Sequence, residues 1–450
     1  MGHHARKPAT HGDMGFNLPE CARGFVVEFK GNENWHTLPE VKLENGSKLR
    51  LYAATQLSQV RHIWKQFQRT AWHTPFQNFD WINAWFESKN QDLKVKPFII
   101  LGFKEGALQF ILPFASETYF GLKRLSWAAN EVNDYNCPLI KTEFLPQLTV
   151  ATVGKIYQHI ALHISDIDVF NLTRQPKFLA GIANPFVSTD ARSSSCDSHS
   201  IRLDSNWSSL YAQQRSAKSR SRLRQKTRRL KRAGNLRFMA IRGPQLQACI
   251  DRILQWKSVQ LEQKGERNPF DKRSQDPLSG SVLTQTIKQF ADVDTENNPL
   301  RVYGLFLDGE MIAGLIAFVE NKTFSLFTMS YGPEVFTNCS AGSILLVKTI
   351  ELAARTKLHT YDFLAGDEPY KLSWCDEKLD LYDCVFAVTS IGQLVAFSSI
   401  ARLEVKKSIK ASIPAMNFLK KSNRSRLQIQ GALAIFRTPF MKRFNHAGNR

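Results

Sequence analysis

The sequence has few cysteines, and none of them has the spacing of a metal site or a disulfide framework. The seven are scattered along the chain and odd in number, with no Cys-x-x-Cys pair: Cys21, Cys137, Cys196, Cys249, Cys339, Cys375 and Cys384. This distribution is typical of reduced thiols in a cytoplasm and argues against a zinc site. The histidines also lack ligand spacing, so we expect no metal and assign no role to His11, His36, His62 or His73.

Long apolar runs are missing as well. The amino-terminal segment has no apolar stretch of the kind that a signal peptide needs, and Arg6 stands where a myristoylation motif would have Ser or Thr. The uncharged stretch from Cys384 to Ala401 is too polar for a membrane span and instead predicts a strand, a turn and the start of a helix. We therefore expect a cytoplasmic protein, with peripheral attachment at the inner membrane face as an alternative.

Positive charge is abundant, and two segments carry its excess. The formal net charge is +20, yet the segment from Arg215 to Arg237 alone has 11 Lys or Arg and no acid. From Ile391 to the end there are 12 Lys or Arg against the single acid Glu404. The rest of the chain is slightly acidic, as expected of an ordinary globular surface.

The length of 450 residues and the 43% hydrophobic content predict two packed domains with tails. A Ser-rich break at 184–200 separates two regions of regular patterning. We expect a loosely ordered leader over 1–46, a first domain over 47–190, a second over 200–390 and a basic extension over 391–450.

The two regions repeat one order of elements. In the first, helical patterns precede two apolar runs joined by a hairpin signal at Lys104-Glu105-Gly106, followed by a strand, a helix and a strand. In the second, a basic helix over 215–233 leads into a strand and a helix, and a three-strand meander with turns at Asp308-Gly309 and Glu320-Asn321-Lys322 follows. The helix 343–356 and the strand 361–364 come last. This repetition predicts a duplicated α/β module with mixed sheets.

Three motifs carry a resemblance to known families. The meander, the loop that opens a helix and the strand after it resemble the core order of the GNAT acyltransferase fold. The stretch "KSRSRLRQKTRRLKRAGNLRF" resembles the helix that opens the second domain of FemAB-like proteins. "YDFLAGDEPYKLSW", Tyr361 to Trp374, resembles the signature of BioF2-like acetyltransferases, the group of the CelD-like proteins of cellulose and exopolysaccharide synthesis. "FDWINAWFES" and "NDYNCPLI" resemble first-domain pieces of that group.

The resemblance implies a tandem GNAT-like protein that transfers an acyl group to an amine or hydroxyl of an envelope or polysaccharide precursor. Acyl-CoA would be the co-substrate. One alternative is a FemAB-type transferase that takes an aminoacyl group from tRNA. The other is a degenerate scaffold of a polysaccharide synthesis system.

The turn before helix 343–356 is the predicted site for the donor phosphates. Ser340, Ala341, Gly342 and Ser343 would present free N–H groups at the positive end of the helix dipole. Asn338, Ala341 and Ser343 depart from the usual GNAT pattern, so ordinary helix capping stays as the alternative.

The loop after strand 361–364 holds the predicted catalytic residues. Asp367 or Glu368 would act as general base if burial raised its pKa, and Tyr370 would protonate a leaving thiolate. Lys371 would hold a phosphate or a substrate carboxylate, or would pair with Glu368 and only brace the loop.

Further binding residues are predicted on the basic helix and in the first domain. Arg220, Arg224 and Arg228 would clamp an anionic substrate, or would contact tRNA or an anionic membrane, or would be solvated. No aromatic residue between Arg215 and Leu236 is available to stack on bases, which argues against recognition of single-stranded RNA. We also expect no specific DNA binding. Asp134 and Tyr135 are either substrate-binding residues in the interdomain cleft or turn residues. The basic tail is either a cationic extension resting on a membrane or disordered.

Overall fold

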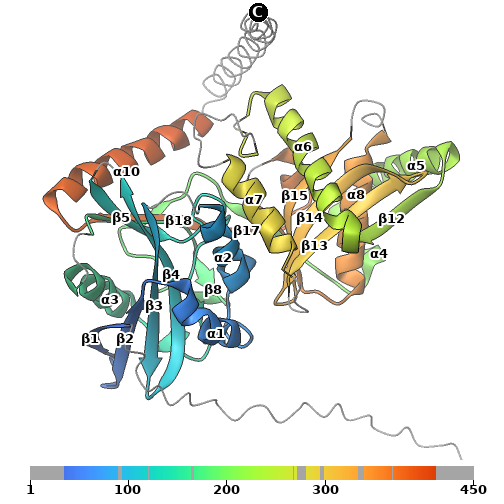
Figure 1. Cartoon of the computed structure of the whole chain (residues 1–450). Helices are drawn as coiled ribbons and strands as arrows, with labels where there is room; N and C mark the ends of the chain where they lie inside the picture. The colour runs from blue at the N-terminus through green and yellow to red at the C-terminus, as the bar shows by residue number, and fades with distance from the viewer. Residues whose placement is uncertain are drawn as a thin grey trace, which may run out of the picture.

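The computed structural model describes residues 35–89, 94–119, 121–163, 167–266, 268–270, 280–293, 298–332, 339–366 and 368–411. Within these residues the chain forms two α/β units that lie side by side, each built on one large mixed sheet (Figure 1). The expected leader before residue 35, the tail after 411 and Asp367 lie outside the described residues.

The first sheet has the order β1-β2-β3-β4-β5-β7-β18-β10. Its strands are β1 (His36–Lys42), β2 (Lys48–Ala54), β3 (Val95–Lys104), β4 (Ala107–Tyr119), β5 (Leu122–Trp127), β7 (Val169–Pro176), β18 (Leu381–Ala387) and β10 (Arg192–Ser193), with β6 (Leu139–Ile140) beside β4. One face is covered by α1 (Leu57–Phe67), η1 (Pro75–Gln77) and α2 (Phe79–Ser88). The other is covered by η2 (Leu145–Gln147) and α3 (Val150–His163). A two-stranded ribbon, β8 (Phe178–Leu179) with β9 (Ile182–Ala183), stands apart.

The second sheet has the order β12-β13-β14-β15-β16-β11-β17. Its strands are β12 (Leu236–Ile241), β13 (Leu300–Leu307), β14 (Glu310–Glu320), β15 (Thr323–Tyr331), β16 (Thr360–Ala365), β11 (Ser198–Arg202) and β17 (Glu377–Leu379). One face carries η3 (Gly243–Gln245), α6 (Leu246–Lys264) and α7 (Gly280–Ala291). The other face carries α4 (Trp207–Gln214), α5 (Ala217–Ala233) and α8 (Ala341–Arg355). The short α9 (Pro369–Leu372) follows β16.

The predicted hairpins are confirmed, because each predicted turn joins two paired strands. Glu105, Asp308, Asn321 and Lys322 all have positive φ, as tight hairpin turns require. The two units also repeat one plan. In each, an antiparallel meander precedes a helix, α3 or α8, and a strand that pairs parallel to the last meander strand. Both parallel pairings span three residue pairs, from Arg124 opposite Val169 in the first unit and from Thr323 opposite Thr360 in the second.

Two expected boundaries are wrong. Residues 36–42 are not part of a loose leader but form β1, which pairs with β2 and buries Leu38 and Val41. Residues 381–387 do not belong to the second unit, because β18 pairs with β7 and β10 of the first sheet, and α10 (Ser390–Ala411) packs against β7 and β18. The pairing of β18 with β7 joins distant segments and leaves no local sequence signal. The pairing of β1 with β2 is a local hairpin closed by the turn at residues 43–47, and patterning overlooked it.

An aromatic cluster joins the cores of the two units. Trp81 of α2 contacts Phe290 of α7 and Phe318 of β14 edge to face, with ring centroids 5.5 and 5.3 Å apart. Such contacts belong to packed interiors and not to a solvated hinge. The two units therefore share one continuous apolar core.

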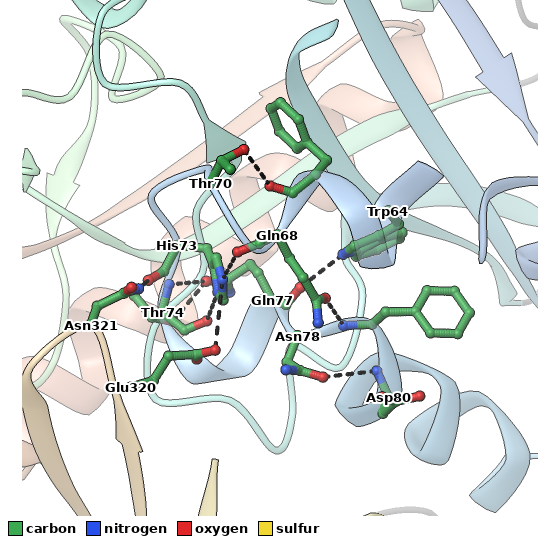
Figure 2. Close-up of polar contacts among 12 residues, drawn as sticks. Trp64, Gln68, Thr70, His73, Thr74, Gln77, Asn78, Asp80, Glu320 and Asn321 are labelled. Atoms are coloured by element: carbon green, nitrogen blue, oxygen red, sulfur yellow. Dashed lines mark hydrogen bonds and ion pairs between the residues drawn. The ribbon is translucent and has the colours of Figure 1, made fainter. Parts of the chain in front are cut away.

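His73 lies at the same junction (Figure 2). Its ring nitrogens lie 2.9 and 3.0 Å from the carbonyl oxygens of Thr74 and Gln68, and Nε2 is 3.7 Å from Glu320 Oε1. Asn321 donates a side-chain hydrogen bond of 3.0 Å to the His73 carbonyl. His73 is thus a buried structural residue that links the first unit to the β14–β15 turn.

Candidate active site

A pocket of about 460 Å³ opens where β15 and β16 separate. The two strands are paired only from Thr323–Thr360 to Ser325–Asp362, and beyond that point they diverge. Residues from both faces of the sheet and from the segment after β16 line the pocket. They include Tyr211, Arg215, Arg222, Lys226, Lys257, Gln260, Lys264, Tyr331, Ser340, Ala341, Gly342, Ser343, Tyr370, Ser373 and Trp374.

The lining of this pocket is cationic. Its charged members among the described residues are Arg215, Arg222, Lys226, Lys257 and Lys264, and no described Asp or Glu lines it. A low-dielectric concavity with charge of one sign concentrates the field and attracts ions of the opposite sign. The pocket is therefore suited to a ligand with several negative charges.

The amino-terminal turn of α8 forms one wall. Ser340 has φ +53° and makes no side-chain capping bond; its Oγ instead accepts a hydrogen bond of 2.5 Å from Lys226 Nζ. The first helical bond runs from Ile344 N to Ser340 O, so the N–H groups of residues 341–343 have no acceptor in the described part of the chain. Ser340 therefore does not act as the ordinary cap that was the alternative reading.

Gly342 allows this turn to pack closely. A Cβ at this position would lie 3.1 Å from Cδ1 of Tyr331, the last residue of β15. The absence of a side chain thus lets the turn lie against the Tyr331 ring at the floor of the pocket.

The loop after β16 lies against the same pocket. Tyr370, Ser373 and Trp374 share its lining with the 340–343 turn, so the structure brings the two predicted segments together. Burial raises the pKa of Tyr370, which keeps the hydroxyl protonated at neutral pH. The position and the protonation state of Tyr370 both suit a proton donor.

Glu368 and Lys371 form an ion pair that braces this loop. Lys371 is buried, and its Nζ lies 2.9 Å from Glu368 Oε2 and donates to the Ala365 carbonyl at 2.9 Å. Burial alone would raise the pKa of Glu368, but the Lys371 ammonium outweighs it and holds that pKa below its usual value. The expectation that burial raises the pKa of Glu368, as its role as general base would require, is therefore wrong. Gly366, with φ +130°, makes room for the pair, since a Cβ there would lie 2.5 Å from Glu368 Oε2.

Asp134 and Tyr135 reach this loop from the first unit. The Tyr135 hydroxyl lies 2.9 Å from both carboxylate oxygens of Asp362 on β16 and also contacts Ser198 Oγ. Burial raises the pKa of Asp362, and it raises the pKa of Asp134 to about 6. Neither Asp134 nor Tyr135 lines the pocket, and Tyr135 supports the strand that leads into the loop.

The basic helix α5 is divided between two pockets. Arg222 and Lys226 line the first, whereas Arg224 and Arg228 line a smaller one of about 270 Å³ between α4, α5 and α8. Arg220 lines neither; its guanidinium lies 6.0 Å from the Tyr211 ring centroid. The predicted set Arg220, Arg224 and Arg228 thus lies on a face beside the one that enters the main pocket.

Sequence reasoning missed two groups of pocket residues. Lys257 and Lys264 come from α6, where an ordinary amphipathic pattern hides them. Trp207, Tyr211 and Trp374 stack in near-parallel pairs, with centroids 4.8 and 5.9 Å apart. These rings come from α4 and from the segment after α9. The sequence of α5 itself contains no aromatic residue and so did not indicate them.

Known proteins resemble the chain at the level of family and fold. Residues 217–372 match the family model described as an acetyltransferase (GNAT) domain. With the repeated plan of the two units, this match confirms the tandem GNAT-like fold and identifies the second unit as an acyltransferase domain. A search of curated proteins found no match.

Three solved structures align along most of the chain. FemX has a TM-score of 0.49 at 10% identity, covering 75% of this chain and 98% of its own. A conserved protein of unknown function from Bacteroides thetaiotaomicron has a TM-score of 0.45 at 11% identity, and the alignment covers 78% of this chain and 100% of that protein. A tandem GNAT protein from the clavulanic acid biosynthesis pathway has a TM-score of 0.38 at 10% identity, and the alignment covers 79% of this chain and 99% of that protein. All three scores lie below 0.5.

Two further findings concern metals and membranes. Among the described residues, no group of three or more His, Cys, Asp or Glu is arranged to hold a metal ion. No helix in that part of the chain is long and apolar enough to cross a membrane.

Proposed function

We propose that the protein transfers an acyl group from a donor, held by its phosphates in the cationic pocket, to an amine or hydroxyl of a second substrate. The observation that carries this proposal is the pocket itself: among the described residues, five cations and no acid line it together with the amino-terminal turn of α8. We take acyl-CoA as the first donor candidate, because its pyrophosphate matches this charge and these donors.

The pocket residues suggest how the transfer proceeds. Lys226 and the N–H groups of residues 341–343 would hold the donor phosphates. The nucleophile of the acceptor attacks the thioester carbonyl, the carbon–sulfur bond breaks, and the Tyr370 hydroxyl donates its proton to the leaving thiolate. Asp367 lies outside the described residues and stays a candidate for the base that accepts the nucleophile's proton.

A FemAB-type reaction with aminoacyl-tRNA is the second candidate. None of the nine Lys or Arg residues of α5 makes an ion pair with an acid in the described part of the chain, and they extend well beyond the pocket. Such an unpaired cationic face suits a long polyanion better than one cofactor. The stacked rings of Trp207 and Tyr211 beside it could take an unpaired base.

The acceptor and the location of the reaction are a further part of the proposal. The resemblance of "YDFLAGDEPYKLSW" to the CelD-like signature favours an envelope or polysaccharide precursor as acceptor. On α10, the side chains of Ile391, Leu394 and Phe397 are exposed by 61%, 73% and 75%. An exposed apolar face next to a basic tail supports peripheral contact with an anionic membrane. A degenerate scaffold of a polysaccharide synthesis system is the non-enzyme alternative.

Thermal shift with acetyl-CoA, longer acyl-CoAs and aminoacyl-tRNA in parallel tests the proposal. A donor present at 100 times its dissociation constant should stabilise the protein by about 2.7 kcal/mol. Lys226→Met should weaken binding of the true donor about tenfold, since it removes one charge-assisted phosphate contact. Lys218→Met is the matched control, because Lys218 lies on α5 outside both pockets. If no donor shifts the wild-type protein, the scaffold reading replaces the enzyme.

A further inference from the structure

Helix α6 changes character along one face. Its buried stripe of Ile250, Ile253 and Leu254 packs against β14 and β15. The same face continues at the helical spacing of three and four residues as Lys257, Gln260 and Lys264, and all three line the main pocket. The half-buried Lys257 and the exposed Lys264 thus continue the line of the buried stripe towards the carboxyl end of the helix.

Neither lysine has a carboxylate partner in the described part of the chain. Lys257 is half-buried and Lys264 is exposed. The buried Lys89 and Lys371, by contrast, each have a carboxylate partner: Lys89 lies 2.7 Å from Glu131, and Lys371 lies 2.9 Å from Glu368. A desolvated ammonium without a counter-ion is costly, and burial lowers the pKa of Lys257. The carboxylates of Glu368 and Glu266 oppose this shift, and Glu368 is already paired with Lys371. The ammonium groups of Lys264 and Lys371 add to the shift.

Gln260 lies between the two lysines and anchors their helix to the second sheet. Its side-chain amide donates a hydrogen bond of 3.1 Å to the carbonyl of Tyr331 and so holds α6 at the end of β15. Seven residues of helix place Lys257 and Lys264 about 10 Å apart along the axis. The two ammonium groups can therefore contact an anionic ligand at two separate points instead of acting on one atom.

These lysines approach the pocket from the opposite side to the proposed phosphate site. Helix α6 packs in the core on one face of the second sheet, and α5 and α8 pack on the other face (Figure 1). Lys226 and the turn at residues 340–343 therefore belong to one wall, and Lys257 and Lys264 to the facing wall. A donor pyrophosphate at α8 would leave the cations of α6 without a partner.

We propose that Lys257 and Lys264 form a second anion subsite, which binds a phosphate or carboxylate group of the acceptor. This inference rests on the proposed function, in that the α8 wall is taken by the donor. The acceptor is then itself anionic, and the attacking amine or hydroxyl enters from the α6 side towards Tyr370. Neutral acceptors would lack the group that offsets the burial of Lys257.

Titration calorimetry at low ionic strength tests this subsite with CoA as the donor probe and inorganic phosphate or succinate as the acceptor probes. With CoA saturating, one of these anions should still bind the wild-type protein, and comparing phosphate with succinate tells which group is preferred. Lys257→Met and Lys264→Met should each weaken that binding at least fivefold and leave CoA affinity within twofold. Arg252→Met is the matched control, since Arg252 lies on α6 outside the pocket and contacts Glu310.

The same titration gives a second readout. An anion beside Lys257 favours its charged form. In a titration series carried towards alkaline pH, where the lowered pKa of Lys257 leaves the free amine partly neutral, binding should therefore take up protons, visible as a heat that depends on the ionisation enthalpy of the buffer. Anion binding unchanged in both lysine variants, or absent from the wild type, overturns the inference. Loss of CoA binding in the same variants also overturns it, by assigning the lysines to the donor. If CoA fails to bind but lysine-dependent anion binding persists, the proposed donor is wrong and the anion subsite stands.

Discussion

Asp134 shows how a residue far from the pocket in sequence is coupled to the loop beside it. Its carboxyl group lies in a partly buried setting near Lys371, Arg174, Asp362 and Glu368, and burial is the largest cause of its raised pKa of about 6. In the unfolded chain this pKa returns to its ordinary value of 3.8. The folded protein therefore holds a proton on Asp134 that the unfolded chain has released between these two values.

From this difference we predict that the contribution of Asp134 to stability falls as the pH rises from about 4 to 6. Asp134→Asn mimics the protonated acid, so the variant should match the wild type near pH 4. Near pH 8 the free energy of unfolding of the variant should exceed that of the wild type by about 2–3 kcal/mol. Denaturant unfolding at the two pH values measures this. The exposed Asp190→Asn should show no such pH-dependent gain, and an equal stability difference at both pH values would contradict the prediction.

At the scale of single elements, α5 is the part of the site that sequence patterning describes best. Its cationic face and its seam of Leu223, Thr227 and Leu230 predict a helix, and the structure has one over Ala217–Ala233. Which cations enter the pocket depends on how α5 packs against α8, and local patterning does not contain that information. The predicted binding residues Arg220, Arg224 and Arg228 therefore lie on a helix that borders the main pocket, on the face beside the one that lines it.

If α5 binds a polyanion, charge reversal at Arg224 and Arg228 should weaken binding without unfolding the helix. Both side chains are exposed, so exchange to Glu should cost little stability. The slope of log affinity against log salt for tRNA should fall by about 2, because each phosphate contact releases counter-ions. Reversal of the exposed Lys96 and Lys155 of the first unit is the control of equal charge change. Association that does not depend on salt would rule out a polyanion on this helix.

On the scale of the whole molecule, the two units act together at the site. The second unit supplies every residue that lines the main pocket, while Tyr135 of the first unit holds Asp362, two residues before Leu364, which has φ +60°. The cluster of Trp81, Phe290 and Phe318 joins their cores. A change in the packing between the units therefore acts directly on the strand that leads into the loop proposed to hold the catalytic residues.

The duplicated plan could be predicted because hairpin turns and helical periodicity are local signals. The β1–β2 hairpin was missed although its turn at residues 43–47 is local. The return of β18 to the first sheet could not be predicted, because it depends on contacts between distant segments. The same holds for the site. The turn at residues 340–343 and Tyr370 lie in local motifs, but Lys257 and Lys264 become pocket residues only when α6 ends beside β15.

The central claim is that the open turn of α8 binds the phosphates of an acyl donor, and Ser343→Asp tests it most directly. Ser343 is exposed in the first turn of α8. A carboxylate introduced there is stabilised by the helix dipole but repels a bound phosphate. Ala151→Asp in the first turn of α3 is the matched control. We predict that Ser343→Asp keeps the melting temperature of the free protein and lowers donor affinity, measured by titration calorimetry with acyl-CoA or aminoacyl-tRNA, at least tenfold. Donor binding that is unchanged in this variant would contradict the claim.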